Sequence, residues 1–199
     1  MHIGLDFDNT IVCYEALFHR VAVKMSFIPP GAAKSKTAVR DYLRREDRES
    51  DWIELQSHIY GFQITHAPPF DGVGAFIDLA RDKACGVSVI SHKTEFANGH
   101  PEWNLHEAAR GWLAANGLGD ISENGLAYFE LTRSAKLERI RSCKIDVFVD
   151  DLPEFLSEPE FPAAVERILF DPWDVHPEDG AYIKINSWPE IADEVLGRC

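Results

Sequence analysis

Two aspartates separated by one residue stand at the end of the first apolar run of the chain, residues 2–7. On an extended backbone, residues two apart project to the same side, so Asp6 and Asp8 could converge at the mouth of a strand. Carboxylates that close repel each other unless a cation lies between them or one of them holds a proton. Both arrangements serve phosphoryl transfer, because a metal offsets the charge of a phosphate and a protonated carboxyl donates to the leaving oxygen. Taken alone, the pair is weak evidence, because Asp-rich strand ends also serve as caps and turns.

Three further segments carry residues that could complete such a site. Ser91 ends a second apolar run, Lys136 opens a short helical segment, and Asp150 and Asp151 follow a third apolar run. A hydroxyl and an ammonium could hold phosphate oxygens, although a turn Ser, a solvated Lys and a helix-capping Asp are the ordinary alternatives. Ligands of open parallel sheets bind outside the carboxyl ends of the strands, so the sequence predicts that these groups meet at one rim.

The segments between these motifs alternate between strand and helix patterns, which is typical of a Rossmann-like, doubly wound α/β fold with a parallel sheet covered on both faces. The spacing predicts strands at residues 2–7, 86–91, 126–131, 145–149 and 167–170, with helices at 72–83 and 134–142.

Residues 14–69 interrupt this alternation with a different composition. Helical patterns cover residues 15–27 and 37–48, and a third helix is expected after Asp51 as its N-cap. Proline pairs at residues 29–30 and 68–69 are natural breaks. We therefore expect an α/β core made of residues 1–13 and 70–199, with a small helical cap, residues 14–69, inserted after the first strand.

The ordered set of Asp-x-Asp-Asn-Thr, then Ser, then Lys, then Asp-Asp resembles the motifs of the haloacid dehalogenase (HAD) superfamily of phosphatases. The resemblance covers residues 1–13 and 70–175, and the insertion is similar to the family's first type of cap only in position and helical character. It implies that Asp6 attacks phosphorus and becomes a phosphoaspartate. It also implies that Asp8 is the general acid for the leaving group and then the base for water, and a second Asp at this position favours phosphatases over dehalogenases.

The same resemblance implies roles for the remaining motif residues. Thr10 would help to shape the turn, Ser91 would bind the phosphoryl oxygens and Lys136 would neutralise them, with Lys144 as the alternative lysine. Mg²⁺ would be held by oxygen ligands, which suit this ion: Asp6, the backbone carbonyl of Asp8, Asp150, and Asp151 directly or through water. His92 and Lys93 follow the second strand, so we expect them to contact substrate as residues of a strand-end loop.

The amino-acid composition argues against several classes of binding partner. Twenty Lys and Arg against 33 Asp and Glu give a net charge of −13, which opposes binding to nucleic acid or anionic membranes. Four dispersed cysteines form no CxxC pair, and no signal segment or apolar run of about 20 residues is present, so we expect a cytoplasmic protein. Glycine-rich phosphate loops of P-loop and dinucleotide enzymes are absent, and no histidine is assigned to a metal. The oligomeric state is not indicated.

The resulting hypothesis is Mg²⁺-dependent hydrolysis of a small-molecule phosphomonoester. Phosphotransfer to another alcohol and a catalytically silent binding or regulatory protein are the alternatives. A nucleotide substrate stays open, because residues 171–174 resemble the Pro-aromatic segment of deoxyribonucleotidases and cap aromatics could stack on a base. These aromatics are Phe27, Trp52 and Tyr60. Four cap arginines could either meet an anionic substrate or form a salt-bridged surface with interleaved acids: Arg40, Arg44, Arg45 and Arg48.

Overall fold

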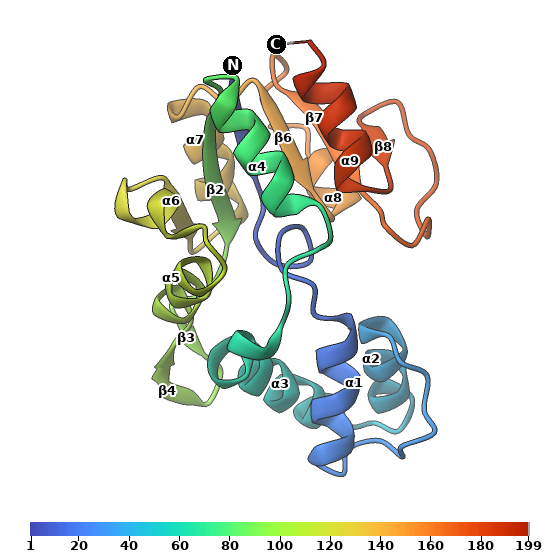
Figure 1. Cartoon of the computed structure of the whole chain (residues 1–199). Helices are drawn as coiled ribbons and strands as arrows, with labels where there is room; N and C mark the ends of the chain where they lie inside the picture. The colour runs from blue at the N-terminus through green and yellow to red at the C-terminus, as the bar shows by residue number, and fades with distance from the viewer. Residues whose placement is uncertain (199) are drawn as a thin grey trace.

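The computed structural model describes residues 1–198 and is built around one six-stranded sheet (Figure 1). The strand order is β5-β2-β1-β6-β7-β8, and every neighbouring pair is parallel. β1 lies in the middle, between β2 and β6, so the carboxyl ends of these three strands meet at one rim. The strands are β1 His2–Leu5, β2 Gly86–His92, β5 Ala127–Glu130, β6 Val147–Asp150, β7 Glu166–Phe170 and β8 Ile183–Ile185.

Helices cover both faces of the sheet, as the alternating pattern predicts. Phe148 and Val149, neighbours on β6, point into two separate apolar clusters on opposite faces. The cluster around Val149 includes side chains of α4, α5, α6, α9 and η3, and the cluster around Phe148 includes side chains of α7 and α8. The bounds are α4 Val73–Asp82, α5 Leu105–Ala115, α6 Gly119–Glu123, α7 Arg133–Ser142, α8 Pro153–Leu156, α9 Trp188–Ile191 and η3 Ala192–Leu196. Within residues 1–198, no helix has the length and apolar character needed to cross a bilayer.

The segment between β1 and α4 is helical and lies beyond the rim of the sheet in Figure 1. Its helices pack around buried aromatic side chains, and Trp52 stacks on Phe18 with 5.1 Å between ring centroids. The third helix begins at Glu49, so the prediction that Asp51 caps it was wrong. Asp51 instead accepts a hydrogen bond from the Arg48 side chain within the first turn. The elements are α1 Glu15–Lys24, α2 Lys36–Arg45, α3 Glu49–Ser57, η1 His58–Phe62 and η2 Ile64–His66.

The two chain segments that connect this helical insertion to the sheet run side by side. The Cys13 amide donates to the Pro68 carbonyl at 2.9 Å, and the Phe70 amide donates to the Ile11 carbonyl at 2.9 Å. The two expected boundaries of the insertion, residues 13–14 and 69–70, lie in these paired segments. A hairpin of β3 Phe96–Ala97 and β4 His100–Asn104, from the part of the chain expected to be core, packs against η1 as well. The insertion therefore packs against a hairpin that the sequence patterns assign to the core.

Gly4 lies on β1 beside β6, where the neighbouring side chains leave no room for a Cβ atom. A Cβ atom at this position would lie 2.5 Å from Phe148 Cδ2 and 3.1 Å from Ile145 Cγ2, and both of these side chains are buried. Gly4→Ala should lower the free energy of unfolding by about 1–3 kcal/mol, because a packed ring has no space to move into. Urea unfolding followed by circular dichroism measures this loss.

Gly74→Ala is the matched control, since a Cβ there meets no atom within 4 Å and the residue lies inside α4. It should raise the free energy of unfolding by about 0.5–1 kcal/mol through helix propensity. Equal effects of the two substitutions would contradict the close packing of β1 against β6.

Candidate active site

A tight turn follows β1 and places its acidic residues at the rim. The Asp6 amide donates to the Val149 carbonyl at 2.9 Å, which extends the pairing of β1 with β6 by one residue. The amides of Ile11 and Val12 then both donate to the Phe7 carbonyl, and Asn9 adopts a left-handed conformation with φ 59°. Asn tolerates this conformation better than most residues.

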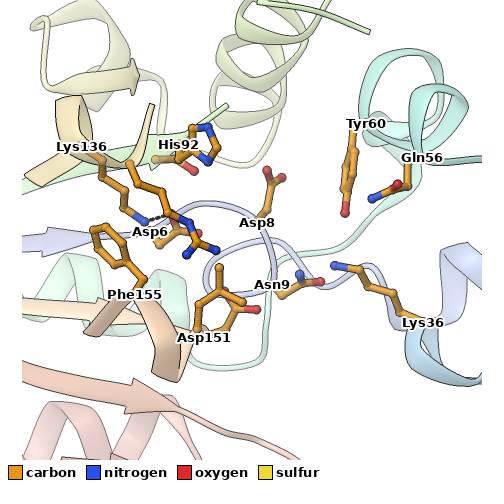
Figure 2. A pocket seen from close by; sticks show the side chains of 13 residues that line it. Asp6, Asp8, Asn9, Lys36, Gln56, Tyr60, His92, Lys136, Asp151 and Phe155 are labelled. Carbon is orange, nitrogen blue, oxygen red and sulfur yellow. Dashed lines mark hydrogen bonds and ion pairs between the residues drawn. The ribbon is translucent and has the colours of Figure 1, made fainter. Parts of the chain in front are cut away.

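Lys136 joins two of the rim aspartates. Its Nζ lies 2.6 Å from Asp6 Oδ1 (Figure 2). It also lies 2.6 Å from Asp150 Oδ2, and the lysine is 2% exposed. Thr132 begins α7 by accepting a hydrogen bond from the Ala135 amide, which puts Lys136 in the first helical turns. Burial lowers the pKa of Lys136, but the charges of Asp150 and Asp6 raise it further, so the pKa lies above its ordinary value. Lys144, the alternative lysine, precedes β6 at the other end of that strand from Asp150.

Asp6, Asp150 and Asp151 form an acidic cluster. Each offers a carboxylate oxygen, and these oxygens lie within 4.8 Å of one another. Burial raises the pKa of Asp150 to about 6, with Lys136 opposing the rise and Asp6 adding to it. Burial, followed by the charges of Asp150 and Asp6, raises the pKa of Asp151 well above its usual range. Further positive charge would therefore stabilise the ionised cluster, and an all-oxygen donor set fits Mg²⁺.

Asp8 is held by two buried donors. Lys93 Nζ lies 2.6 Å from Asp8 Oδ2, and the Tyr14 hydroxyl donates to Asp8 Oδ1 at 2.7 Å. Burial, followed by the charge of Asp8, raises the pKa of Tyr14 well above its usual range, so this tyrosine stays a donor. Lys93 is expected from the sequence to contact substrate, but here it is 4% exposed and its ammonium contacts Asp8. No sequence pattern indicates this role of Tyr14.

Asp6, Asp8, Lys136 and Asp151 lie on the wall of a cavity of about 320 Å³ (Figure 2). Ser91 and His92 line it from the end of β2, as expected, whereas Thr10 lies beneath the wall, with its Oγ1 3.5 Å from Asp151 Oδ1. The structure thus brings the rim residues of four separate motifs together. The cavity is lined by Asp6, Asp8, Asn9, Lys36, Gln56, Tyr60, Ser91, His92, Arg133, Lys136, Asp151, Leu152 and Phe155.

Lys36 is the main cavity residue that the sequence did not single out. Ser35 caps α2 through the Ala38 amide, which makes Lys36 the first residue of the helix, directed at the rim (Figure 2). Burial lowers the pKa of Lys36, but Tyr60 and the charge of Asp151 raise it above its ordinary value. The ammonium is therefore a fixed positive charge on the side of the cavity that the insertion provides.

The cap arginines form ion pairs with neighbouring acids, which agrees with the salt-bridged surface rather than a substrate cluster. The pairs are Arg40 with Asp41, Arg44 with Glu49, Arg45 with Glu46 and Arg48 with Asp51.

The aromatic residues considered for base stacking lie in different places. Trp52 is a core residue and Phe27 is packed against the core, whereas Tyr60 lines the cavity. Pro172 and Trp173 line a neighbouring cavity, whose wall also includes Lys36 and Asp151.

Solved structures with a similar fold are known, although sequence comparisons find no relative. No protein-family model and no curated protein matches the sequence. A HAD family hydrolase from Deinococcus radiodurans with bound phosphate and sodium is 13% identical with a TM-score of 0.62, covering 98% of this chain and 95% of its own. A predicted phosphatase from Clostridium acetobutylicum is 13% identical with a TM-score of 0.62, covering 98% of both chains.

A HAD-superfamily hydrolase from Ehrlichia chaffeensis is 12% identical with a TM-score of 0.59, covering 98% of this chain and 96% of its own. A protein described as a dehalogenase is equally similar, at 13% identity and a TM-score of 0.59, so similarity of shape does not separate the two chemistries. The neighbours align with the helical insertion as well as the sheet, since nearly the whole chain is covered. The chain therefore has the fold of the HAD superfamily of hydrolases.

Proposed function

We propose that this chain is a Mg²⁺-dependent phosphatase that hydrolyses a small phosphomonoester through a phosphoaspartate on Asp6. The observation that carries the proposal is the position of Asp6 on the cavity wall, beside the buried Lys136 and within 4.8 Å of the Asp150 and Asp151 carboxylates. A nucleophilic carboxylate, a fixed cation and an oxygen-ligand cluster are the three components that phosphoryl transfer requires.

The first step breaks the ester bond. An Asp6 carboxylate oxygen attacks phosphorus in line with the leaving oxygen, which departs as an alcohol after taking a proton from Asp8. Lys136 stays beside the nucleophile and offsets the charge that gathers on the phosphoryl oxygens. Bound Mg²⁺ supplies additional positive charge at the phosphoryl group. Ser91 is positioned on the wall to donate a hydrogen bond to the same group.

The second step releases phosphate. Asp8, now ionised, removes a proton from water as that water attacks phosphorus, and the bond to Asp6 breaks to regenerate the carboxylate. The contacts of Asp8 with Lys93 and Tyr14 hold its side chain in position for this proton transfer.

The cavity favours a small and polar leaving group. Its volume of about 320 Å³ is at the lower end of ligand pockets. Lys36, Gln56 and Tyr60 enter from the insertion, across the cavity from Asp6 (Figure 2), and Arg133 lines the cavity from α7. The wall therefore carries hydrogen-bond donors and positive charge. The net charge of −13 makes nucleic acid and anionic membranes poor partners and leaves a small phosphate ester as the substrate class.

Phosphate release from a panel of small phosphomonoesters, measured with Mg²⁺ and with EDTA, tests the proposal. We expect turnover with Mg²⁺ and a loss of about 100-fold or more on chelation, because charge compensation at the phosphoryl group is removed. A parallel arm supplies 2-haloacids and measures halide release, since one structural neighbour is described as a dehalogenase.

Halide release without phosphate release would assign the chain to carbon attack instead. Transfer of the phosphoryl group to an added alcohol, in place of water, would identify a phosphotransferase. No turnover across the panel by folded, Mg²⁺-saturated protein would contradict the proposal and favour a binding or regulatory protein.

A further inference from the structure

A second group of potential metal ligands lies where the β3–β4 hairpin packs against the insertion, away from the acidic cluster. Glu54 and His58 are four residues apart across the continuous turns of α3 and η1, and His100 opens β4 in the hairpin. His58 Nε2 lies 3.1 Å from Glu54 Oε1, and His100 Nε2 lies 3.0 Å from Glu54 Oε2. One potential ligand atom from each residue lies within 4.8 Å of the others.

We propose that Glu54, His58 and His100 bind one divalent transition-metal ion of the Zn²⁺ class, with water as the fourth ligand. Zinc bonds of about 2.0–2.1 Å in a tetrahedral site place neighbouring donor atoms roughly 3.3 Å apart. Glu54 Oε1 lies 3.1 Å from His58 Nε2 and 3.1 Å from His100 Nε2, close to that spacing, and the ligand atoms of the three residues all lie within 4.8 Å of one another. Two imidazoles and a carboxylate also favour Zn²⁺ over Mg²⁺, which prefers oxygen ligands.

The surroundings of His100 are those of a metal-binding imidazole. Its Nδ1 lies 3.2 Å from Glu102 Oε1, and a histidine that binds metal through one nitrogen commonly donates from the other to a carboxylate. Its ring stacks on Trp103 at 3.9 Å with an interplanar angle of 7°, and the His58 ring lies 4.8 Å from the same indole. Both rings are thus oriented before any ion binds, which lowers the entropic cost of assembling the site.

An ion pair between Glu54 and protonated histidines is the alternative explanation for the same contacts. It accounts for the distances and for both contacts of His100, because a protonated imidazole donates from both nitrogens, so zinc titration is what separates the two explanations. The side chains of His58 and His100 are 28% and 22% exposed, so an ion can reach them from solvent.

The position of the site suggests what the ion does. Gln56 and Tyr60, which line the catalytic cavity, alternate along α3 and η1 with Glu54 and His58, and a step of two residues turns a helix by about 200°. One face of this helical segment therefore meets the cavity and another meets the hairpin. A metal ion would tie the hairpin to the segment, next to the hydrogen bond from Ser57 to the Asn98 carbonyl, and would stiffen the cavity wall.

Zinc binding to the full chain, measured by isothermal titration calorimetry with excess Mg²⁺ present, tests the site without any activity readout. We expect one Zn²⁺ per chain with a Kd below about 1 μM and a rise in the thermal midpoint. His58→Ala and His100→Ala should each weaken binding by about 100-fold or more and remove the thermal shift. Glu102→Gln should weaken it by about 10-fold, because the supporting acceptor loses its charge.

Two controls separate this site from others on the chain. His66→Ala removes an exposed histidine of the same lobe and should leave zinc affinity unchanged, and Asp6→Asn should also leave it unchanged if the ion is not in the acidic cluster. Co²⁺ in place of Zn²⁺ should give the visible absorption of a tetrahedral site, lost in both histidine variants. Binding weaker than about 1 μM, or binding that survives both variants, would mean an adventitious ion only and would overturn the proposal.

Discussion

Asp6→Asn is expected to lower kcat for phosphate release by at least about 10⁴-fold, because an amide cannot form the phosphoaspartate. The substitution is nearly isosteric, and Lys136 keeps its contact with Asp150, so the fold should be retained. Steady-state phosphate release on the best ester of the panel gives kcat. An acid quench after mixing with radiolabelled substrate should trap protein-bound phosphate in the wild type and none in the variant.

Asp41→Asn is the matched control. Asp41 is an exposed carboxylate on α2 that pairs with Arg40 and does not line the cavity, so the same chemical change there should leave kcat within about twofold. If Asp6→Asn keeps activity within tenfold of the wild type, a nucleophile other than Asp6 must carry the phosphoryl group. Circular dichroism of both variants separates loss of chemistry from loss of fold.

The rim of the site could be predicted because simple rules fix it. Asp6, Ser91 and Asp150 stand at the ends of apolar runs, and parallel strands deliver their carboxyl ends to one edge. Lys136 lies in the early turns of a helix whose capping Thr132 stands in the sequence just before it. Local patterns were sufficient for these positions, since each residue sits next to the element that orients it.

The far wall of the cavity could not be predicted in this way. Lys36 and Tyr60 reach the rim only because the helices of the insertion pack in one particular arrangement, which no local pattern encodes. The position of Lys93 after a strand end predicts contact with substrate. In the structure Lys93 is buried, and its ammonium forms an ion pair with Asp8. Burying a cation without a partner costs several kcal/mol, so a lysine that is buried here has to pair with a carboxylate such as Asp8.

Strand limits also depended on long-range contacts. The sequence predicts a strand at residues 145–149, which includes Ile145 and Asp146, whereas β6 begins at Val147. The Asp146 carboxylate accepts a hydrogen bond from the His2 amide at 2.7 Å, which fixes the entry to the strand. β8 was not predicted, because an edge strand of three residues, Ile183–Ile185, carries too short a pattern to be recognised.

The candidate zinc site illustrates the same limit. Glu54 and His58 show a four-residue spacing, but the third ligand, His100, comes from a hairpin 42 residues further along the chain. The spacing of the histidines along the sequence therefore indicates no metal site. Only the packing of the hairpin on η1 brings the three side chains together.

Lys136→Met is expected to lower the free energy of unfolding by about 3–5 kcal/mol in the presence of EDTA, because it leaves buried carboxylates without their counter-charge. Its ammonium contacts both Asp6 and Asp150, and methionine retains most of the side-chain volume but none of the charge. Urea unfolding in EDTA measures the loss. Phosphate release should fall together with stability, since the same ammonium lies beside the nucleophile.

Lys144→Met is the matched control and also tests the alternative lysine. Lys144 is exposed and lies between α7 and β6, away from the acidic cluster, so the same substitution should change the free energy of unfolding by no more than about 0.5 kcal/mol. Equal losses in the two variants, or full activity in Lys136→Met, would contradict the role assigned to Lys136.

The pH dependence of the Lys136→Met effect follows from the acidic cluster. The pKa of Asp150 is raised to about 6 from its model-compound value of 3.8, so the folded protein binds more protons than the unfolded chain between these two values. Stability contributed by such a group is present at low pH and is lost as the pH rises through the folded pKa. Without Lys136 the carboxylates lose the cation that opposes this rise, so protonation relieves more repulsion in the variant than in the wild type. The destabilisation should therefore be smaller at about pH 5 than at about pH 8, and a loss that does not change with pH would place the effect in packing rather than in charge.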